Sequence, residues 1–226
     1  IEILSRNHTT ILYTPPNYEE LRYFVDQKSL NNYDIRFMPN PVVGICNSVP
    51  SKEKLILYVG SINVQQKRSD LLLDFWELCH EKLPDWEFKV VGTGPYYSQL
   101  KADLEKRLLP RVELLGFQRP EVYYEKAAIL VMPSAYEGLP NTIIEANSFG
   151  CPILAFSSYS ALEWIVENGK NAILAEPFDV ASLASLFIEY TRDEEIMEEM
   201  QIAALENARR FEITEIGRQW LNLLHS

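Results

Sequence analysis

The chain has 226 residues, 47% hydrophobic and 23% charged, an ordinary composition for a globular protein with one large or two small cores. Its 32 acidic and 21 basic residues give a formal charge of −11, which argues against a broad surface for nucleic acid or an anionic membrane. The three cysteines are far apart, so no disulfide framework is visible and a reducing compartment is expected. No apolar run reaches the roughly 20 residues of a membrane span, so we expect neither a membrane-spanning helix nor a signal peptide in this sequence. Because the first residue is Ile1 and not Met, we expect a fragment of a longer protein.

The first part of the chain predicts a strand, a helix and a second strand before a linker. A β-branched run over Thr9–Pro15 precedes the amphipathic stretch Asn17–Lys28, for which Asn17 is the expected N-cap. A second apolar run covers Ile35–Val43. Prolines and polar residues over Pro39–Glu53 predict a linker to the next unit.

Beyond the linker, short apolar strands alternate with amphipathic helices. The predicted strands are Lys54–Gly60, Trp86–Gly92, Val112–Gly116, Ala128–Pro133, Pro152–Phe156 and Ala172–Glu176. The helices between them are Arg68–Leu83, Tyr96–Arg107, Glu121–Ala127, Thr142–Ser148 and Ala161–Glu167. Helical periodicity alone follows over Val180–Tyr190, Asp193–Ala208 and Ile213–His225. This alternation predicts an α/β fold, a doubly wound parallel sheet covered on both faces, with a helical C-terminal tail.

Ligands of such a sheet bind beyond the carboxyl ends of its strands, where the strand order reverses, so the segments after the strands are candidates. In the first of these, Gly60 ends a strand, and Lys67 and Arg68 stand at the start of a helix. Backbone amides and an ammonium group would converge there on an anion. Two solvated surface bases in a long loop are the alternative.

The segment Val90–Leu100 contains two glycines but does not fit the dinucleotide fingerprint G-x-G-x-x-G. The third glycine would fall at Tyr97, and Pro95 interrupts the entry to the helix. We therefore expect a tight strand-to-helix turn and no nicotinamide cofactor.

The segment Ser134–Phe156 places Glu137 in a Gly/Pro loop and Glu145 among apolar neighbours, where a charge is costly unless something pairs with it. Thr142 and Glu145 fit the S/T-x-x-E pattern, so a capping box is one explanation. A ligand is the other, because a helix start leaves free amides, here those of Leu139, Asn141 and Thr142. A loop carboxylate beside such amides suits a hydroxyl-rich ligand with a phosphate, which describes a sugar nucleotide.

Four segments, in this order and spacing, resemble the carboxyl-terminal, donor-binding domain of GT-B glycosyltransferases: VGSINVQQK, VVGTGP, LLGFQRPEVYYEKA and PSAYEGLPNTIIEANSFGCPILA. They are most similar to the retaining family 4, group 1, whose Glu–seven residues–Glu motif would be Glu137 and Glu145. The resemblance covers about Lys54–Phe211. It implies that 1–46 is a remnant of an amino-terminal acceptor domain plus linker, 47–210 the Rossmann-like nucleotide-sugar domain, and 211–226 a crossover helix.

The resemblance also implies roles for single residues. Lys67 would contact the donor diphosphate, Glu137 the hydroxyls of the donor sugar, and Glu145 the ribose. The amides of Leu139, Asn141 and Thr142 would lie near sugar and phosphate, and the backbone near Gln118 would hold the base.

Two positions in the segment that follows the first strand of the sheet, Ser61 and Arg68, depart from the family pattern. Ser61 stands where the family usually has an arginine, and Arg68 replaces the usual glycine after the lysine. We hypothesise that Arg68 compensates for the missing arginine in diphosphate binding. No D-x-D occurs in the chain, so no metal and no other cofactor are expected.

The implied function is retaining glycosyl transfer from a nucleotide-diphosphate sugar, with UDP as the expected nucleotide, to a glycan or glycolipid acceptor in envelope polysaccharide synthesis. We expect a cytoplasmic protein, peripheral on the inner membrane face in its full-length form, that meets its acceptor through an amino-terminal domain. Front-face substitution is the mechanism that the family favours, and a covalent intermediate on Glu137 is the alternative. Two other classes stay open: a non-catalytic, degenerate transferase domain that binds or regulates a partner, which Ser61 favours, and an unrelated flavodoxin-like binding domain.

Overall fold

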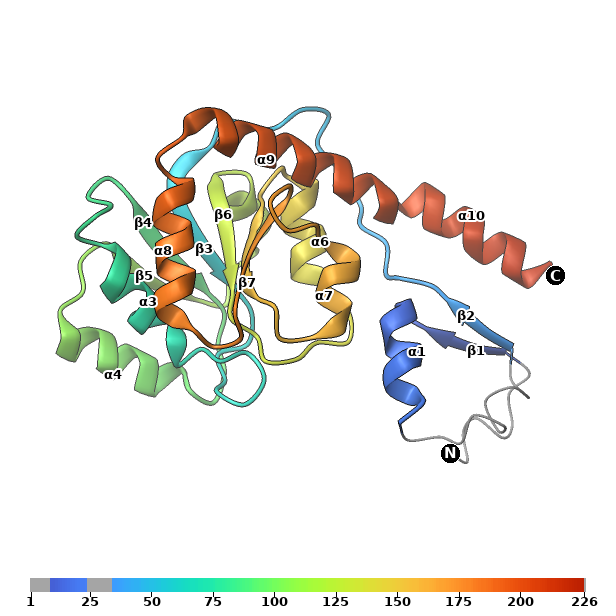
Figure 1. Cartoon of the computed structure of the whole chain (residues 1–226), viewed down its shortest axis with the longest axis horizontal. Helices are drawn as coiled ribbons and strands as arrows, with labels where there is room; N and C mark the ends of the chain where they lie inside the picture. Colours follow the sequence, from blue (N-terminus) through green and yellow to red (C-terminus); the bar gives the residue numbers. More distant parts are fainter. Residues whose placement is uncertain (1–8, 24–33, 226) are drawn as a thin grey trace.

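The computed structural model of the protein describes residues 9–23 and 34–225. In that part of the chain, six strands form one parallel sheet in the order β5-β4-β3-β6-β7-β8, which confirms the predicted doubly wound α/β fold (Figure 1). The strands are β3 (Glu53–Val59), β4 (Glu87–Val91), β5 (Val112–Gly116), β6 (Ala127–Met132), β7 (Ile153–Phe156) and β8 (Ala172–Ala175). The helices that accompany them are α3 (Leu71–Cys79), α4 (Tyr97–Arg107), α5 (Glu121–Tyr124), α6 (Asn141–Ser148), α7 (Ser160–Ile165), α8 (Val180–Tyr190), α9 (Glu194–Ala208) and α10 (Ile213–Leu224).

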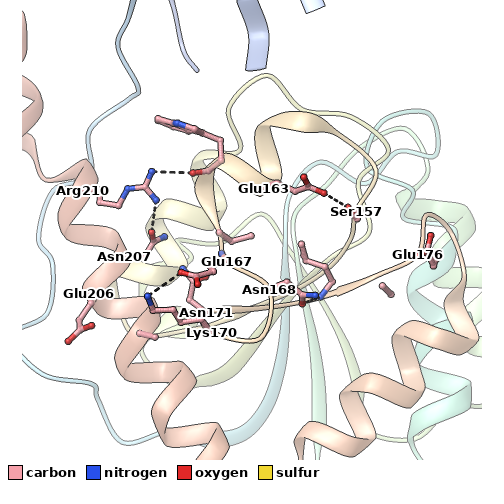
Figure 2. Close-up of a pocket in the computed structure, with 15 residues that line it drawn as sticks. Ser157, Glu163, Glu167, Asn168, Lys170, Asn171, Glu176, Glu206, Asn207 and Arg210 are labelled. Atoms are coloured by element: carbon pink, nitrogen blue, oxygen red, sulfur yellow. Dashed lines mark hydrogen bonds and ion pairs between the residues drawn. The ribbon is translucent and has the colours of Figure 1, made fainter. Parts of the chain in front are cut away.

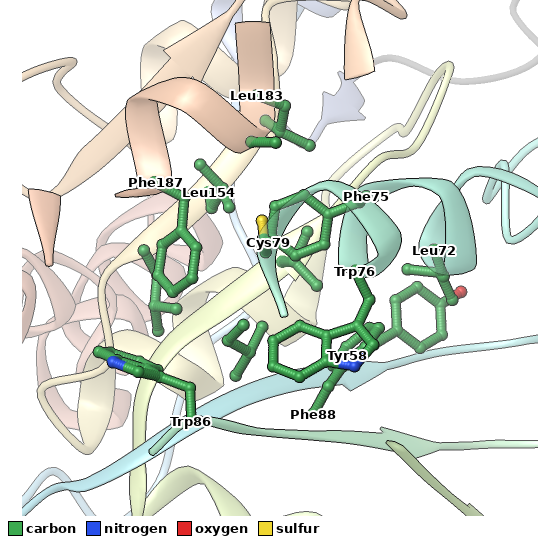
Figure 3. Close-up of a cluster of buried hydrophobic side chains, with 14 of the residues drawn as sticks. Tyr58, Leu72, Phe75, Trp76, Cys79, Trp86, Phe88, Leu154, Leu183 and Phe187 are labelled. Atoms are coloured by element: carbon green, nitrogen blue, oxygen red, sulfur yellow. The ribbon is translucent and has the colours of Figure 1, made fainter. Parts of the chain in front are cut away.

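The sheet is buried on both faces, because successive residues of a strand point to opposite sides and both sets are apolar. On β3, Ile56 and Tyr58 pack into the cluster formed with α3 and α8. Leu55 and Leu57, on the same strand, pack into the cluster formed with α6 and α7. Figure 3 shows the first cluster, in which aromatic rings from α3, α8 and β4 meet over the sheet.

The strand order reverses beside β3. The chain builds one half of the sheet through β4 and β5, then returns to the other side of β3 with β6 and continues through β7 and β8. The loops that leave the carboxyl ends of β3 and β6, residues 60–70 and 133–140, therefore flank the point where ligands of such sheets bind. Both predicted site loops are in this position.

A small unit precedes the sheet and lies beside it in Figure 1. It consists of β1 (Thr9–Leu12), α1 (Pro15–Leu21) and β2 (Asp34–Phe37), with β1 parallel to β2. The expectation that Asn17 caps the helix is wrong, because α1 begins after Thr14 and the Asn17 side chain accepts a hydrogen bond from the Thr14 amide (3.1 Å). Prolines at the first two helical positions have the backbone angle that a helix needs, which explains the earlier start. Helix α1 ends at Leu21, earlier than expected, and residues 24–28 of the predicted helix and 1–8 of the predicted remnant lie outside the described residues.

The linker and the last helix meet at Val42. Its amide donates to the Phe211 carbonyl (2.7 Å), and its carbonyl accepts from the Ile213 amide (3.1 Å). From there α10 runs out beyond the sheet, on the side of β1 and α1 (Figure 1). The predicted helix Ile213–His225 is thus present, and its role as a crossover to another domain stays a prediction.

Several expected helices are shorter than their sequence pattern, among them α3 and α5. Helix α3 starts at Leu71 rather than at Arg68, because Arg68 adopts a left-handed backbone conformation (φ 48°). Helix α5 ends at Tyr124, and Ala127, expected at the end of this helix, is the first residue of β6.

Candidate functional site

Lys67 and Glu137, which are 70 positions apart, meet between the loops that follow β3 and β6. The distance from Lys67 Nζ to Glu137 Oε1 is 2.5 Å, and Gln66 Nε2 donates to the other carboxylate oxygen (3.1 Å). The Glu137 side chain is only 7% exposed and that of Lys67 16%. A carboxylate so well buried needs donors of this kind, and both of its oxygens have one.

The loop that carries Lys67 is shaped by an asparagine. The Asn63 side-chain oxygen accepts hydrogen bonds from the amides of Gln66 and Lys67, both at 3.0 Å. The Ala135 amide then donates to the Gln66 carbonyl (2.7 Å), which ties the two site loops together. Neither Asn63 nor Gln66 was singled out from the sequence, although an asparagine early in a polar loop is a known turn signal.

Arg68 and Ser61 have partners of their own. The Arg68 guanidinium bonds Asp70 through two nitrogens (3.1 and 3.2 Å) and lies 4.8 Å from the ring centroid of Phe178. The Ser61 carbonyl accepts from the Tyr58 hydroxyl (2.9 Å). The charge of Arg68 is therefore already paired, and its compensation for the missing arginine stays a hypothesis.

Glu145 lies one turn into α6, and the capping box expected for it is wrong. The N-cap residue is Pro140, so Thr142 is inside the first turn. Pro140 has no N–H and its restricted φ favours entry into a helix, which moves the start ahead of Thr142. The Glu145 carboxylate accepts instead from the Tyr124 hydroxyl (3.1 Å). Burial raises the pKa of Glu145, the Tyr124 hydrogen bond lowers it, and the nearby charge of Glu121 raises it again.

The first amides of α6 are free, as expected. Among the described residues, the backbone N–H groups of Leu139, Asn141 and Thr142 have no hydrogen-bond acceptor, whereas that of Ile143 donates to the Pro140 carbonyl (3.0 Å). Together with the helix dipole, these amides make the entrance of α6 attractive to an anion.

A hollow of about 410 Å³ lies beyond the carboxyl ends of β3, β4 and β5. Two glycines of its lining lie close together, since a Cβ added to Gly92 would lie 1.8 Å from the Gly60 carbonyl oxygen. The chain passes from β4 to α4 through residues 92–96 alone, which confirms the tight strand-to-helix turn expected there. The hollow is lined by Val59, Gly60, Ser61, Val91, Gly92, Thr93, Phe117, Gln118, Arg119 and Pro120.

A wider groove of about 1070 Å³ separates α1 from the loops that follow β6 and β7. Six aromatic side chains line it: Tyr18, Tyr23, Phe37, Tyr136, Tyr159 and Trp164. Glu19 and Glu20 add carboxylates, and Ser160 bonds Glu20 across it (2.5 Å). The groove reaches the residue next to Glu137.

Figure 2 shows a further pocket of about 780 Å³, between α7, α9 and the edge strand β8. Several of its polar groups bond one another: Asn207 accepts from Arg210 (3.0 Å), and Glu163 accepts from Ser157 (2.8 Å). Asn168 accepts from the Leu174 amide of β8 (2.9 Å), so the pocket wall also protects the sheet edge. Because Asn168, Asn207, Arg210 and Glu163 are already bonded within the protein, we explain this pocket as structure rather than as a site.

The described residues were expected to form no metal site, and two of their thiols are buried. They contain no group of three or more His, Cys, Asp or Glu placed to hold a metal ion. Burial raises the pKa of the Cys79 and Cys151 thiols to about 12, which suits packing rather than reactivity. No helix among the described residues is long and apolar enough to cross a membrane.

Comparison with known proteins adds an independent finding. The family model for glycosyl transferases group 1 matches residues 53–193, more than half of the chain. An uncharacterized glycosyltransferase of Haemophilus influenzae is 30% identical over 205 residues, 84% of this chain and 56% of the relative. An alpha-1,4-N-acetyl-D-galactosaminyltransferase of Campylobacter jejuni is 28% identical over 76% of this chain and 48% of its own length.

A mutant of Staphylococcus aureus TarM, in complex with Fondaparinux, alpha-GlcNAc-glycerol and UDP, superimposes with a TM-score of 0.87 at 25% identity, over 100% of this chain and 45% of that structure. The chain thus spans about half the length of the curated relatives it matches.

Proposed function

Because the chain belongs to the glycosyl transferases group 1 family, we propose that it supplies the donor-binding half of a retaining glycosyl transfer from a UDP-sugar to a glycan or glycolipid. One observation carries this proposal: the contact between Lys67 and Glu137 at the point where the strand order reverses. The free amides of α6 and the hollow at Gln118 lie at loops of the same sheet. The UDP bound to TarM supports the choice of nucleotide.

In the proposed complex, each group has a chemical task. The Lys67 ammonium and the amides of Leu139, Asn141 and Thr142 hold the diphosphate and stabilise the negative charge that grows on it as the sugar leaves. Glu137 orients the sugar hydroxyls, and Glu145 binds the ribose. No metal is needed in this scheme, because the ammonium and the amides supply the positive charge.

The base would occupy the hollow of about 410 Å³, which Gly60, Ser61 and Gln118 help to line. The aromatic groove between α1 and the loops after β6 and β7 would face the acceptor, since rings and carboxylates suit the faces and hydroxyls of sugars.

Retention follows if bond breaking and bond formation use one face of the sugar. The bond from the anomeric carbon to the diphosphate oxygen breaks, the bond to the acceptor oxygen forms on the same side, and the leaving phosphate takes the acceptor proton. Glu137, whose carboxylate accepts from Gln66, is better suited to orient hydroxyls than to attack carbon. In the full-length protein we place the product in envelope glycan synthesis, by analogy with the relatives.

Calorimetric titration of UDP into the chain tests the proposal. We expect Lys67→Ala to weaken binding by about 10- to 100-fold, because it removes a hydrogen bond to a charged group. Lys54→Ala is the matched control, since Lys54 is an exposed lysine paired with Asp85 (3.5 Å), and it should bind as the parent does. If Arg68 compensates for Ser61, Arg68→Ala should lose nearly as much as Lys67→Ala, and an unchanged Kd would reject that hypothesis.

A degenerate, non-catalytic module is the second candidate. Ser61 favours it, because half of the expected basic clamp is missing and Arg68 is held by Asp70. Such a module would show no heat with UDP and no NMR shift near Glu145. That result would reject donor binding and favour a partner-binding role.

A further inference from the structure

In the structure, the Lys67 ammonium is already paired with a carboxylate of the same chain, that of Glu137. The two groups are 2.5 Å apart, and both side chains are largely buried. A diphosphate that takes this ammonium must therefore break the pair. Glu137 would then keep only the hydrogen bond from Gln66 (3.1 Å), and a buried carboxylate left short of donors is strongly unfavourable.

A donor for that carboxylate is available nearby. The Tyr159 hydroxyl is buried and has no hydrogen-bond partner among the described residues. Buried hydroxyls nearly always have one, so an orphan of this kind calls for an explanation. Tyr159 follows β7, the strand next to β6, and its neighbour Ser158 bonds the Ser134 carbonyl in the Glu137 loop (2.7 Å).

Two further observations indicate that the Tyr159 hydroxyl lies near the Glu137 carboxylate. Tyr159 lines the same groove as Tyr136, the residue before Glu137. Burial, and then the charge of Glu137, raise the pKa of Tyr159 well above its ordinary value, so the hydroxyl keeps its proton and can only gain by donating it in a hydrogen bond.

We propose that Tyr159 is a positioning residue that receives Glu137 when a nucleoside diphosphate takes Lys67. In the free protein the Lys67–Glu137 pair holds the site, and binding exchanges that ion pair for a Tyr159–Glu137 hydrogen bond. No covalent bond changes and no proton is transferred. This inference rests on the proposed function, because it assumes that a diphosphate binds at Lys67.

The proposed exchange predicts opposite effects of two single substitutions on the affinity for UDP. Glu137→Gln frees the ammonium before binding, so UDP affinity should rise. Tyr159→Phe removes an unpartnered hydroxyl from the free protein but the new donor from the complex, so affinity should fall by roughly tenfold while the folded state is not weakened. With Glu137→Gln already present, Tyr159→Phe should change the affinity by less than about twofold, since no charge is left to stabilise.

Calorimetry with UDP on the parent, the two single variants and the double variant measures this coupling. Tyr190→Phe is the control, a buried tyrosine that packs against Phe187 in the core, and it should bind UDP as the parent does. Thermal unfolding confirms that each variant is folded. Equal affinities of Tyr159→Phe and the parent would overturn the exchange, as would a loss that persists undiminished in the double variant. In either case, the proposed function stands if Lys67→Ala still weakens the binding of UDP. A parent protein that binds no UDP would overturn both the exchange and the proposed function.

Discussion

At the scale of one residue, Glu145 is a carboxylate whose burial and whose hydrogen bond shift its pKa in opposite directions. Its carboxylate is partly buried in α6, with the Tyr124 hydroxyl as its donor at 3.1 Å. Burial raises its pKa above the ordinary value of 4.5, so the folded protein holds this proton more tightly than the unfolded chain does. The stabilisation from that protonation is fully present below pH 4.5 and is lost as the pH rises through the raised pKa.

Glu145→Gln should therefore stabilise the ligand-free protein at pH 7 and leave its stability unchanged at pH 4. The amide keeps an acceptor for Tyr124 and removes the desolvated charge. Urea unfolding at the two pH values measures the difference, with Glu105→Gln as an exposed control. A variant less stable than the parent at pH 7 would contradict this account of the burial.

At the scale of elements, one lysine joins two helices. Lys52, in the linker before β3, donates from Nζ to the carbonyls of Tyr124 (2.9 Å), Glu125 (3.1 Å) and Phe149 (2.8 Å). These carbonyls lie at the C-terminal ends of α5 and α6, where the helix supplies no N–H donor for them and where its dipole favours a cation. Since α5 carries Tyr124 and α6 carries Glu145, the same lysine supports the position of that pair.

Lys52→Met should lower the free energy of unfolding by about 3 kcal/mol, because it leaves carbonyl groups without their donor inside the protein. Lys54→Met, two positions on, breaks only an exposed ion pair and should cost less than about 1 kcal/mol. Urea denaturation compares the two variants. Equal losses would mean that the ammonium does not stabilise the helix ends.

The whole molecule consists of two parts of very different burial. Strands β6 and β7 are buried along their entire length, while β1, α1 and β2 contain no buried residue. A two-stranded unit with so little burial is marginal alone, so its opening should need far less free energy than that of the sheet.

Hydrogen exchange should separate these parts. We expect the amides of residues 9–12 and 34–37 to exchange roughly a hundredfold or more faster than those of 127–132 and 153–156. Mass spectrometry of peptides resolves the regions, and added UDP should slow exchange in the loops after β3 and β6 but not in β1. Equal protection of both parts would show that the small unit is an integral part of the core.

The local pattern of apolar and polar residues predicted much of the fold of this protein. Apolar runs of strand length and amphipathic stretches of helix length indicate the alternation, and hence the doubly wound sheet, because burial imposes those periods on each element separately. The loops that carry Lys67 and Glu137 could also be assigned from the sequence, since parallel strands bring their carboxyl ends to one edge. Even the free amides of α6 follow from the position of a helix start.

The partners of the site residues were decided only by the tertiary structure. That Glu145 pairs with Tyr124 rather than capping its helix, that Arg68 turns to Asp70, and that Tyr159 is left without a partner depend on loops from different strands. Sequence periodicity reports whether one residue is buried, but a hydrogen bond needs two groups whose distance is set by strand order and by packing between elements. The sequence by itself therefore determined the sheet and the loops of the site, and folding decided which side chain each of those loops presents to which partner.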